Sequence, residues 1–287
     1  MLKKLTPEQV RAYSRRADSQ LSSASDQVVR DLKKLYRDFI LRFSDKLRKN
    51  SNVSDKDIFD RREAVKVMNQ LTTILDEAGL GDVVNGYRDK FSDITLNSLR
   101  YFEMMGVKPS LRSIDANALD ALIQFSETGL RDMVQAQFVA PLRSALIQSS
   151  VGNLPRADIV DTILAIGGDA FSPGQAAVLV NETFNRYSRE VRARKAQELD
   201  LVIYQYQGPD DKITRPACHY MLNYDENGAE GYFYQDEITA DLHPDLEENP
   251  MLVGGGWNCR HAFFPVTLDF AKSQGFEPRA EDEDQAA

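Results

Sequence analysis

Apolar residues recur at three- and four-residue steps through most of the first 199 residues, and this period restricts that part of the chain to packed helices. Thr6 precedes a proline and is followed three positions on by Gln9, which is the pattern of a helix N-terminus. We therefore expect one long helix over 6–49. Its apolar stripe comprises Val28, Val29, Leu32, Leu35, Tyr36, Phe39, Ile40 and Phe43.

Glycines, prolines and capping residues divide the rest of this region. Ser54 and Asp57 predict a new helix start, and Gly79, Gly106 and the stretch around Pro155 predict helix ends. Ser172, followed by Pro173 and Gln175, repeats the arrangement at Thr6. The expected helices cover about 54–78, 83–105, 115–150, 156–167 and 173–199.

The pattern changes at Asp200, where β-branched and aromatic residues replace the helical period. We expect strands at 201–206, 232–234 and 262–266, joined by ordered loops. The predicted fold class is mainly α. A helical domain at 1–199 precedes a small α+β module at 200–270 and an acidic tail at 271–287.

Composition and charge exclude some classes of protein. The 287 residues include 42% hydrophobic and 28% charged residues, as in ordinary globular proteins, and no apolar run approaches the roughly 18 residues of a membrane span. The start of the chain lacks the apolar core of a secretory signal, and there are only two cysteines. We expect a soluble protein, made in a cytoplasm and without a membrane partner.

Charge is distributed unevenly along the chain. Residues 1–50 contain 13 Lys/Arg against 6 Asp/Glu, whereas residues 200–287 contain 5 against 18. The basic start could contact nucleic acid or an acidic protein surface, or it could be the solvated face of a helix, because its charges alternate in sign. The residues proposed for such a contact are Arg30, Lys33, Lys34 and Arg37.

Both cysteines and all three histidines fall within the 44 residues from Cys218 to His261. Thiolate and imidazole are the usual zinc ligands, so a zinc site is one explanation. A disulfide between Cys218 and Cys259 is the second, and two buried free cysteines beside hydrogen-bonding histidines is the third. The expected metal ligands are Cys218, His243, Cys259 and His261.

Catalysis needs a separate hypothesis. Cys259, a histidine and a carboxylate such as Asp211 could form a thiol nucleophile with its base and orienting group, as in a thiol-dependent hydrolase or transferase. The sequence around the two cysteines matches no cysteine-hydrolase pattern, and we expect no enzyme. Gly254-Gly255-Gly256 lacks the Gly-Lys-Ser/Thr of a phosphate-binding loop. We expect a tight turn there, with Trp257 as an apolar anchor of the module.

Two segments of the module resemble the Mu F-like phage head morphogenesis family. The segment from Tyr206 to Cys218 is similar to the opening signature of that family, and the segment from Gly256 to His261 is similar to its closing signature. The helix before them, with Asn181-Glu182-Thr183, extends the resemblance to roughly 100 residues. The residues that carry it are Tyr206, Gly208, Asp211, Thr214, Arg215, Trp257, Asn258 and Arg260.

The resemblance implies a structural minor capsid protein, portal-associated inside the head of the virion. Such a protein acts in viral assembly (head morphogenesis) or in genome ejection, and its implied partners are the portal protein, the capsid interior and packaged DNA. Members of the family are not established enzymes. The chain departs from the family at Met221 and His261, where many members carry further cysteines, and this weakens the case for zinc.

Overall fold

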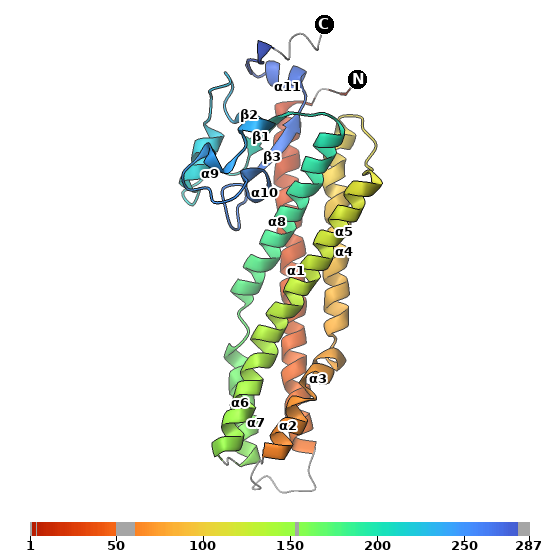
Figure 1. Cartoon of the computed structure of the whole chain (residues 1–287), viewed down its shortest axis with the longest axis vertical. Coiled ribbons are helices and arrows are strands. Elements are labelled where there is room, and N and C mark those ends of the chain that lie inside the picture. The colour runs from red at the N-terminus through yellow and green to blue at the C-terminus, as the bar shows by residue number, and fades with distance from the viewer. Residues whose placement is uncertain (1, 4, 50–60, 153–154, 281–287) are drawn as a thin grey trace. The chain divides into compact units, whose positions relative to one another are not determined.

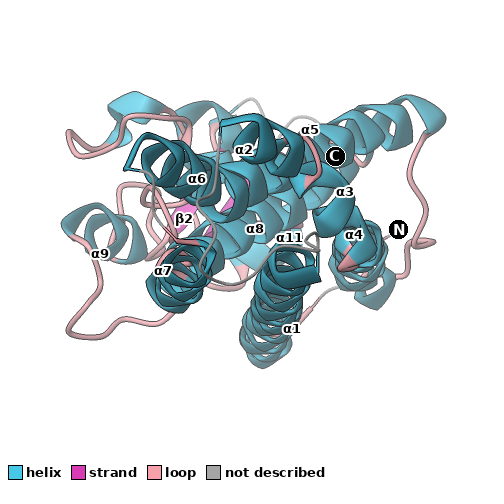
Figure 2. Ribbon diagram, turned by 90° about the horizontal axis from the view of Figure 1, so that it is seen from below, coloured by secondary structure: helices cyan, strands magenta, loops and turns pink. Residues whose placement is uncertain are grey.

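The chain folds mainly as helices with one small sheet, as the sequence predicts. The computed structural model describes residues 2–3, 5–49, 61–152 and 155–280. The expected helix start at Ser54 and Asp57 and the acidic residues 281–287 lie outside these ranges. Figure 2 shows how small the share of strand is beside that of helix.

The helices that precede the sheet follow the predicted period closely (Figure 1). None of the helices among the described residues is long and apolar enough to cross a membrane. The elements of this region are α1 (Pro7–Lys49), α2 (Arg61–Met68), α3 (Leu71–Glu77), α4 (Leu80–Met104), α5 (Ser113–Val134), the π-helical turn η1 (Gln135–Val139), α6 (Ala140–Gly152), α7 (Arg156–Asp169) and α8 (Pro173–Glu198).

Helix caps form where the sequence predicts them. The Thr6 amide donates to the Gln9 side-chain oxygen at 2.8 Å, and the Gln9 amide donates back to Thr6 Oγ1 at 3.3 Å, which completes the capping box of α1. At α8 the Gln175 amide donates to Ser172 Oγ at 3.4 Å. The Gln175 side chain does not return to the cap, because it accepts from Gln137, whose own oxygen accepts from the Ser172 amide.

The module contains more helix than expected, since short helices lie between the strands. Its elements are β1 (Ile203–Gln207), α9 (Pro216–Leu222), β2 (Tyr232–Tyr234), η2 (Gln235–Glu237), η3 (Ala240–Leu242), α10 (Pro250–Val253), β3 (Ala262–Val266) and α11 (Leu268–Lys272). The strands form one antiparallel sheet in the order β2-β1-β3. In Figure 1 the strands and short helices gather beside the C-terminal half of α8.

The chain divides into two compact units, and the division does not follow the boundary expected at residue 199. Unit 1 comprises 1–24, 90–122 and 181–287, and unit 2 comprises 25–89 and 123–180. The module therefore shares unit 1 with the first part of α1, most of α4 and the greater part of α8. Helical segments distant in sequence supply the apolar surface that so small a sheet needs to bury.

Aromatic side chains fill the core of each unit. In unit 1, the fully buried Tyr101 lies 5.1 Å from the ring of Tyr13 and 5.7 Å from that of Phe264, and its hydroxyl donates to the Pro265 carbonyl at 2.8 Å. In unit 2, Phe138 contacts Tyr36 at 4.5 Å between ring centroids. Such pairs stabilise a core beyond the area that they bury.

The C-terminal residues of unit 1 are ordered further than the sequence suggests. Residues 271–280, which we placed in an acidic tail, pack on the module instead. Phe276 is buried, and the Arg279 guanidinium lies 3.9 Å above the Tyr234 ring and pairs with Asp236 at 2.7 Å and Glu237 at 3.0 Å. Glu237 also accepts from the Tyr234 amide, so its carboxylate links two parts of the chain.

Candidate functional site

The two segments that carry the family resemblance meet at one edge of the sheet. Because β1 and β3 are antiparallel, with Tyr206 opposite Phe263, the residues that follow β1 lie beside those that precede β3. Asp211 and Arg260 form a bidentate ion pair at 2.9 and 3.0 Å. This pair closes the loop between the two segments, and it lowers the pKa of the Asp211 carboxyl mainly by hydrogen bonding from Arg260.

Arg215 holds the glycine turn of the closing segment. It stands just before α9 and donates to the carbonyls of Gly255 at 3.2 Å and Trp257 at 2.6 Å. Gly254 and Gly256 have φ angles of 62° and 102°, so the expected tight turn with positive φ is confirmed. Asn258 also has a positive φ, of 56°, a conformation that asparagine tolerates better than most residues.

Cys218, Cys259 and His261 form the centre of the site, here called the Cys/His cluster. The Sγ atoms of the two cysteines lie 3.5 Å apart, and Cys259 Sγ lies 3.6 Å from His261 Nδ1. The three residues are 1%, 4% and 3% exposed. The two cysteines are not joined by a disulfide, and their sulfurs share a hydrogen bond.

The His261 ring has a defined orientation. Its Nε2 lies 2.8 Å from the Pro209 carbonyl oxygen, and a carbonyl only accepts, so Nε2 carries the proton. The lone pair of a neutral ring then sits on Nδ1, which faces Cys259. The ring also stacks on Tyr206, with centroids 5.4 Å apart and planes 9° from parallel.

The surroundings of Cys259 favour a thiolate. The amides of Gly255 and His261 donate to its sulfur at 3.2 and 3.4 Å, and Tyr206 Oη lies 3.9 Å away. Hydrogen bonding from the Cys218 thiol, together with the His261 backbone amide and the charge of Arg189, lowers the Cys259 pKa, although burial acts in the opposite direction. The same hydrogen bond and burial raise the pKa of Cys218.

Two residues of α8, Arg189 and Glu182, support the cluster; from the sequence we named Glu182 only as part of the resemblance and did not name Arg189. Arg189 is buried and donates to the carbonyls of Leu252 at 3.1 Å, Cys259 at 2.6 Å and His261 at 2.8 Å. Glu182, seven residues earlier on the same face, accepts from the Asn258 amide at 2.5 Å. For Arg189, its place two turns after Glu182 on the same helix face was the only sequence signal.

Two glycines allow the backbone to approach the cluster. A Cβ on Gly255 would lie 2.1 Å from Cys218 Sγ, and one on Gly208 would lie 2.1 Å from His261 Cδ2. Neither position has room for a side chain. The cluster is therefore enclosed by backbone on these sides, while on another side a pocket of about 250 Å³ opens onto it. That pocket is lined by Ile213, Thr214, Arg215, Cys218, Asn258, Cys259, Arg260 and His261.

The other two histidines lie apart from the cluster. His243 is not part of the Cys/His cluster. Its ring packs 5.4 Å from that of Tyr220, and its Nδ1 accepts from the Asp245 amide at 3.2 Å. The four-ligand set expected from the sequence is therefore not assembled. His219 is exposed and faces Asp210, although it adjoins the buried Cys218, because neighbours on a helix point in different directions.

The prediction for Trp257 is wrong. This side chain is 57% exposed and does not anchor the module. Its backbone carbonyl, bound by Arg215, is the part that holds the turn. The apolar anchoring comes from buried strand aromatics such as Phe233 and Phe263, whose rings meet edge to face at 5.4 Å.

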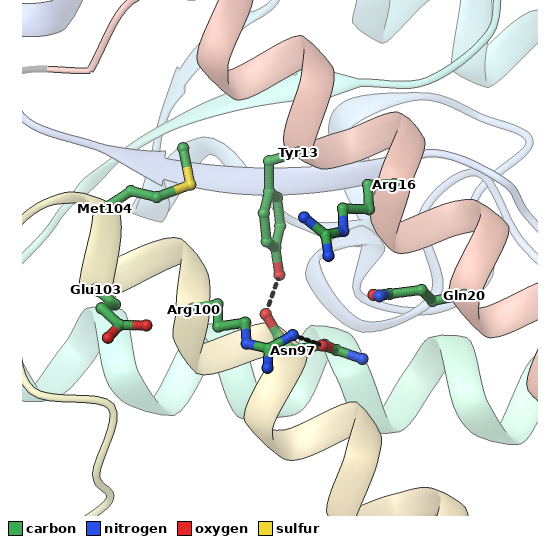
Figure 3. A pocket seen from close by; sticks show the side chains of 7 residues that line it. All are labelled: Tyr13, Arg16, Gln20, Asn97, Arg100, Glu103 and Met104. Carbon is green, nitrogen blue, oxygen red and sulfur yellow. Dashed lines mark hydrogen bonds between the residues drawn. The ribbon is translucent and has the colours of Figure 1, made fainter.

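A second pocket of unit 1 lies between α1 and α4 and has a volume of about 320 Å³. Figure 3 shows Tyr13 pointing from α1 to the Asn97 carbonyl, to which its hydroxyl donates at 2.6 Å. Arg100 donates to the Asn97 side chain at 3.0 Å, and Arg16 lies at the other side of the pocket. The lining brings together no group of catalytic residues.

The basic residues singled out in the first 50 positions lie in unit 2 and are all exposed. Arg30, Lys33, Lys34 and Arg37 follow the spacing of one helix face on α1. Arg37 lies 3.6 Å from Asp38, and Arg30 donates to Gln27. The stripe is thus accessible.

Comparisons with known proteins identify no relative. No family model, no curated protein and no solved structure matches this chain.

Proposed function

We propose that this chain is a structural minor head protein of a phage, associated with the portal inside the capsid and acting in head assembly or genome delivery. The proposal begins with the resemblance of two short segments to the Mu F-like family. One observation supports it most. The segments that carry the resemblance, which start more than 40 residues apart, are joined by the Asp211–Arg260 ion pair and by the bonds of Arg215 to the closing segment.

These contacts also favour a structural role over a catalytic one. Side chains of the two segments bind backbone carbonyls and one another, and Arg189 and Glu182 of α8 bind the closing segment from the other side. Most polar groups of the signature are engaged in this way.

The direct test is association with the portal protein of the same source. The full chain is co-expressed with tagged portal protein, and rings are isolated by size. We expect the chain to migrate with the rings and to occur in purified virions in a few copies. Presence in the soluble fraction alone, with absence from rings and virions, would refute the proposal.

A second candidate function, contact with packaged DNA, is favoured by the exposed stripe of Arg30, Lys33, Lys34 and Arg37. If each residue neutralises one phosphate, the logarithm of the binding constant should fall with the logarithm of salt concentration with a slope of about −3.6. Reversing the charges of Lys33, Lys34 and Arg37 should abolish binding. The control reverses three exposed, scattered residues, Lys108, Arg131 and Arg143, with the same change in net charge. Equal loss in both variants would exclude the stripe.

A further inference from the structure

Two of the three spacings within the Cys/His cluster fit the edges of a coordination tetrahedron. Zinc bonds of about 2.3 Å to sulfur and about 2.05 Å to nitrogen place two sulfurs about 3.8 Å apart, and a sulfur and a nitrogen about 3.6 Å apart. The observed separations are 3.5 Å for Cys218 Sγ to Cys259 Sγ and 3.6 Å for Cys259 Sγ to His261 Nδ1. All three ligand atoms lie within 4.8 Å of one another.

The ligands are also oriented as in a metal site. The Pro209 carbonyl binds His261 Nε2 and directs the Nδ1 lone pair toward Cys259 Sγ, which is the usual outer-shell arrangement for a ligating histidine. Two backbone amides, of Gly255 and His261, donate to Cys259 Sγ. Such donors stabilise a thiolate whether or not a cation is bound.

We propose that Cys218, Cys259 and His261 bind one zinc ion through Sγ, Sγ and Nδ1, and that the fourth coordination position faces the pocket lined by Ile213 and Arg260, where water or another exchangeable donor occupies it. This inference goes beyond the proposed function and does not depend on it. It replaces the four-ligand set predicted from the sequence, because His243 lies against Tyr220. Two thiolates balance the charge of the dication, and soft sulfur ligands favour zinc over magnesium or calcium.

A disulfide between the same cysteines fits the geometry less well. It requires the sulfurs to close from 3.5 Å to about 2.05 Å, and two electrons and two protons must pass to an oxidant. Closing the bond would also leave Nδ1 of His261 without its sulfur partner in its present orientation. A disulfide in freshly prepared protein is therefore an outcome that contradicts the proposal.

The first experiment measures the metal content of the full chain, purified under reducing conditions and dialysed against micromolar zinc. We expect one zinc per chain in the wild type and in His243→Gln and His219→Gln, the matched controls that remove the other two histidines. We expect at least a tenfold loss of zinc affinity in Cys218→Ser, Cys259→Ser and His261→Gln. Substoichiometric zinc in the wild-type chain overturns the proposal, and so does an equal loss in His243→Gln.

A second measurement avoids dependence on variants that fail to fold. Cobalt(II) is added to the wild-type chain, and the absorption spectrum is recorded. Two thiolate ligands should give charge-transfer bands in the near ultraviolet and intense visible bands typical of tetrahedral cobalt. Added imidazole should then shift the visible bands, because the fourth position is open to the pocket. Absent thiolate bands refute the site, and bands unmoved by imidazole refute the open position.

Discussion

Replacing Arg189 with Met tests whether a single buried guanidinium holds the closing segment in place. Arg189 is 3% exposed and donates to three backbone carbonyls, two of them fully buried. Each buried carbonyl left without a donor costs about 1–3 kcal/mol. The variant no longer has to desolvate the charged guanidinium, and this offsets part of that cost. We expect Arg189→Met to lower the free energy of unfolding of unit 1 by about 3 kcal/mol.

The control for this change is available on the same helix. Arg186 lies one turn earlier, and its pair with Glu248 at 3.2 Å has side chains 49% and 58% exposed. Exposed pairs contribute little, so Arg186→Met should cost less than about 0.5 kcal/mol.

The assay is a urea titration followed by fluorescence. Trp257 is the single tryptophan and lies in the closing segment that Arg189 binds, so its emission reports on unit 1. A separate signal for overall helix content follows the whole chain, because two compact units need not unfold together. A cost below about 1 kcal/mol for Arg189→Met, or no difference from Arg186→Met, would show that the three carbonyls find other donors and that the reasoning is wrong.

Three further predictions concern unit 1. Asp115→Asn should lower the free energy of unfolding by about 1 kcal/mol at pH 7. Hydrogen bonding from Arg112 lowers the pKa of Asp115 below its value in the unfolded chain. The stabilisation by Asp115 should therefore be complete above about pH 5 and disappear as the pH falls through the lowered pKa. A stability difference between wild type and Asp115→Asn that grows in acid would contradict this. Gly255→Ala should destabilise unit 1 by more than about 2 kcal/mol in thermal denaturation, because the new Cβ would overlap Cys218 Sγ. The control is Gly174→Ala, which has open space around it and should be neutral or stabilising. Tyr101→Phe should cost about 1 kcal/mol by the same measurement, since it leaves a buried carbonyl without its donor, and an unchanged midpoint would refute that.

Local signals in the sequence predict the secondary structure well. The capping box at Thr6 and Gln9 forms as expected, and the strands at 232–234 and 262–266 have the predicted bounds. The capping box depends on contacts between near neighbours in the sequence, and the strands depend on short runs of aromatic and β-branched residues. Helix α9 was missed because its seven residues offer less than two turns of period, although Pro216 stands at its start.

Tertiary position was harder to predict. Clustering in the sequence put His243 in the predicted metal set with Cys218, Cys259 and His261, but distance along the chain does not determine distance in space, and His243 lies elsewhere. Trp257 was expected to be buried from its residue type, yet the turn that contains it is held through backbone carbonyls. Nothing in the sequence around Arg189 distinguishes it from an exposed polar residue of a helix, because its three acceptors lie more than 60 residues away along the chain.

The ion pair between Asp211 and Arg260 has a consequence for the chain between them. Together with the pairing of β1 and β3, this ion pair holds the two ends of the segment between Asp211 and Arg260 close together, whatever the length of that segment. Loop-closure entropy rises only by about 0.6 kcal/mol for each doubling of length, so a longer connection costs little once its ends are joined. The exposed Glu247, which precedes the Glu248 ion pair and the Asn249 cap of α10, is therefore a place where a peptide tag or a small folded domain could be inserted with the sheet intact.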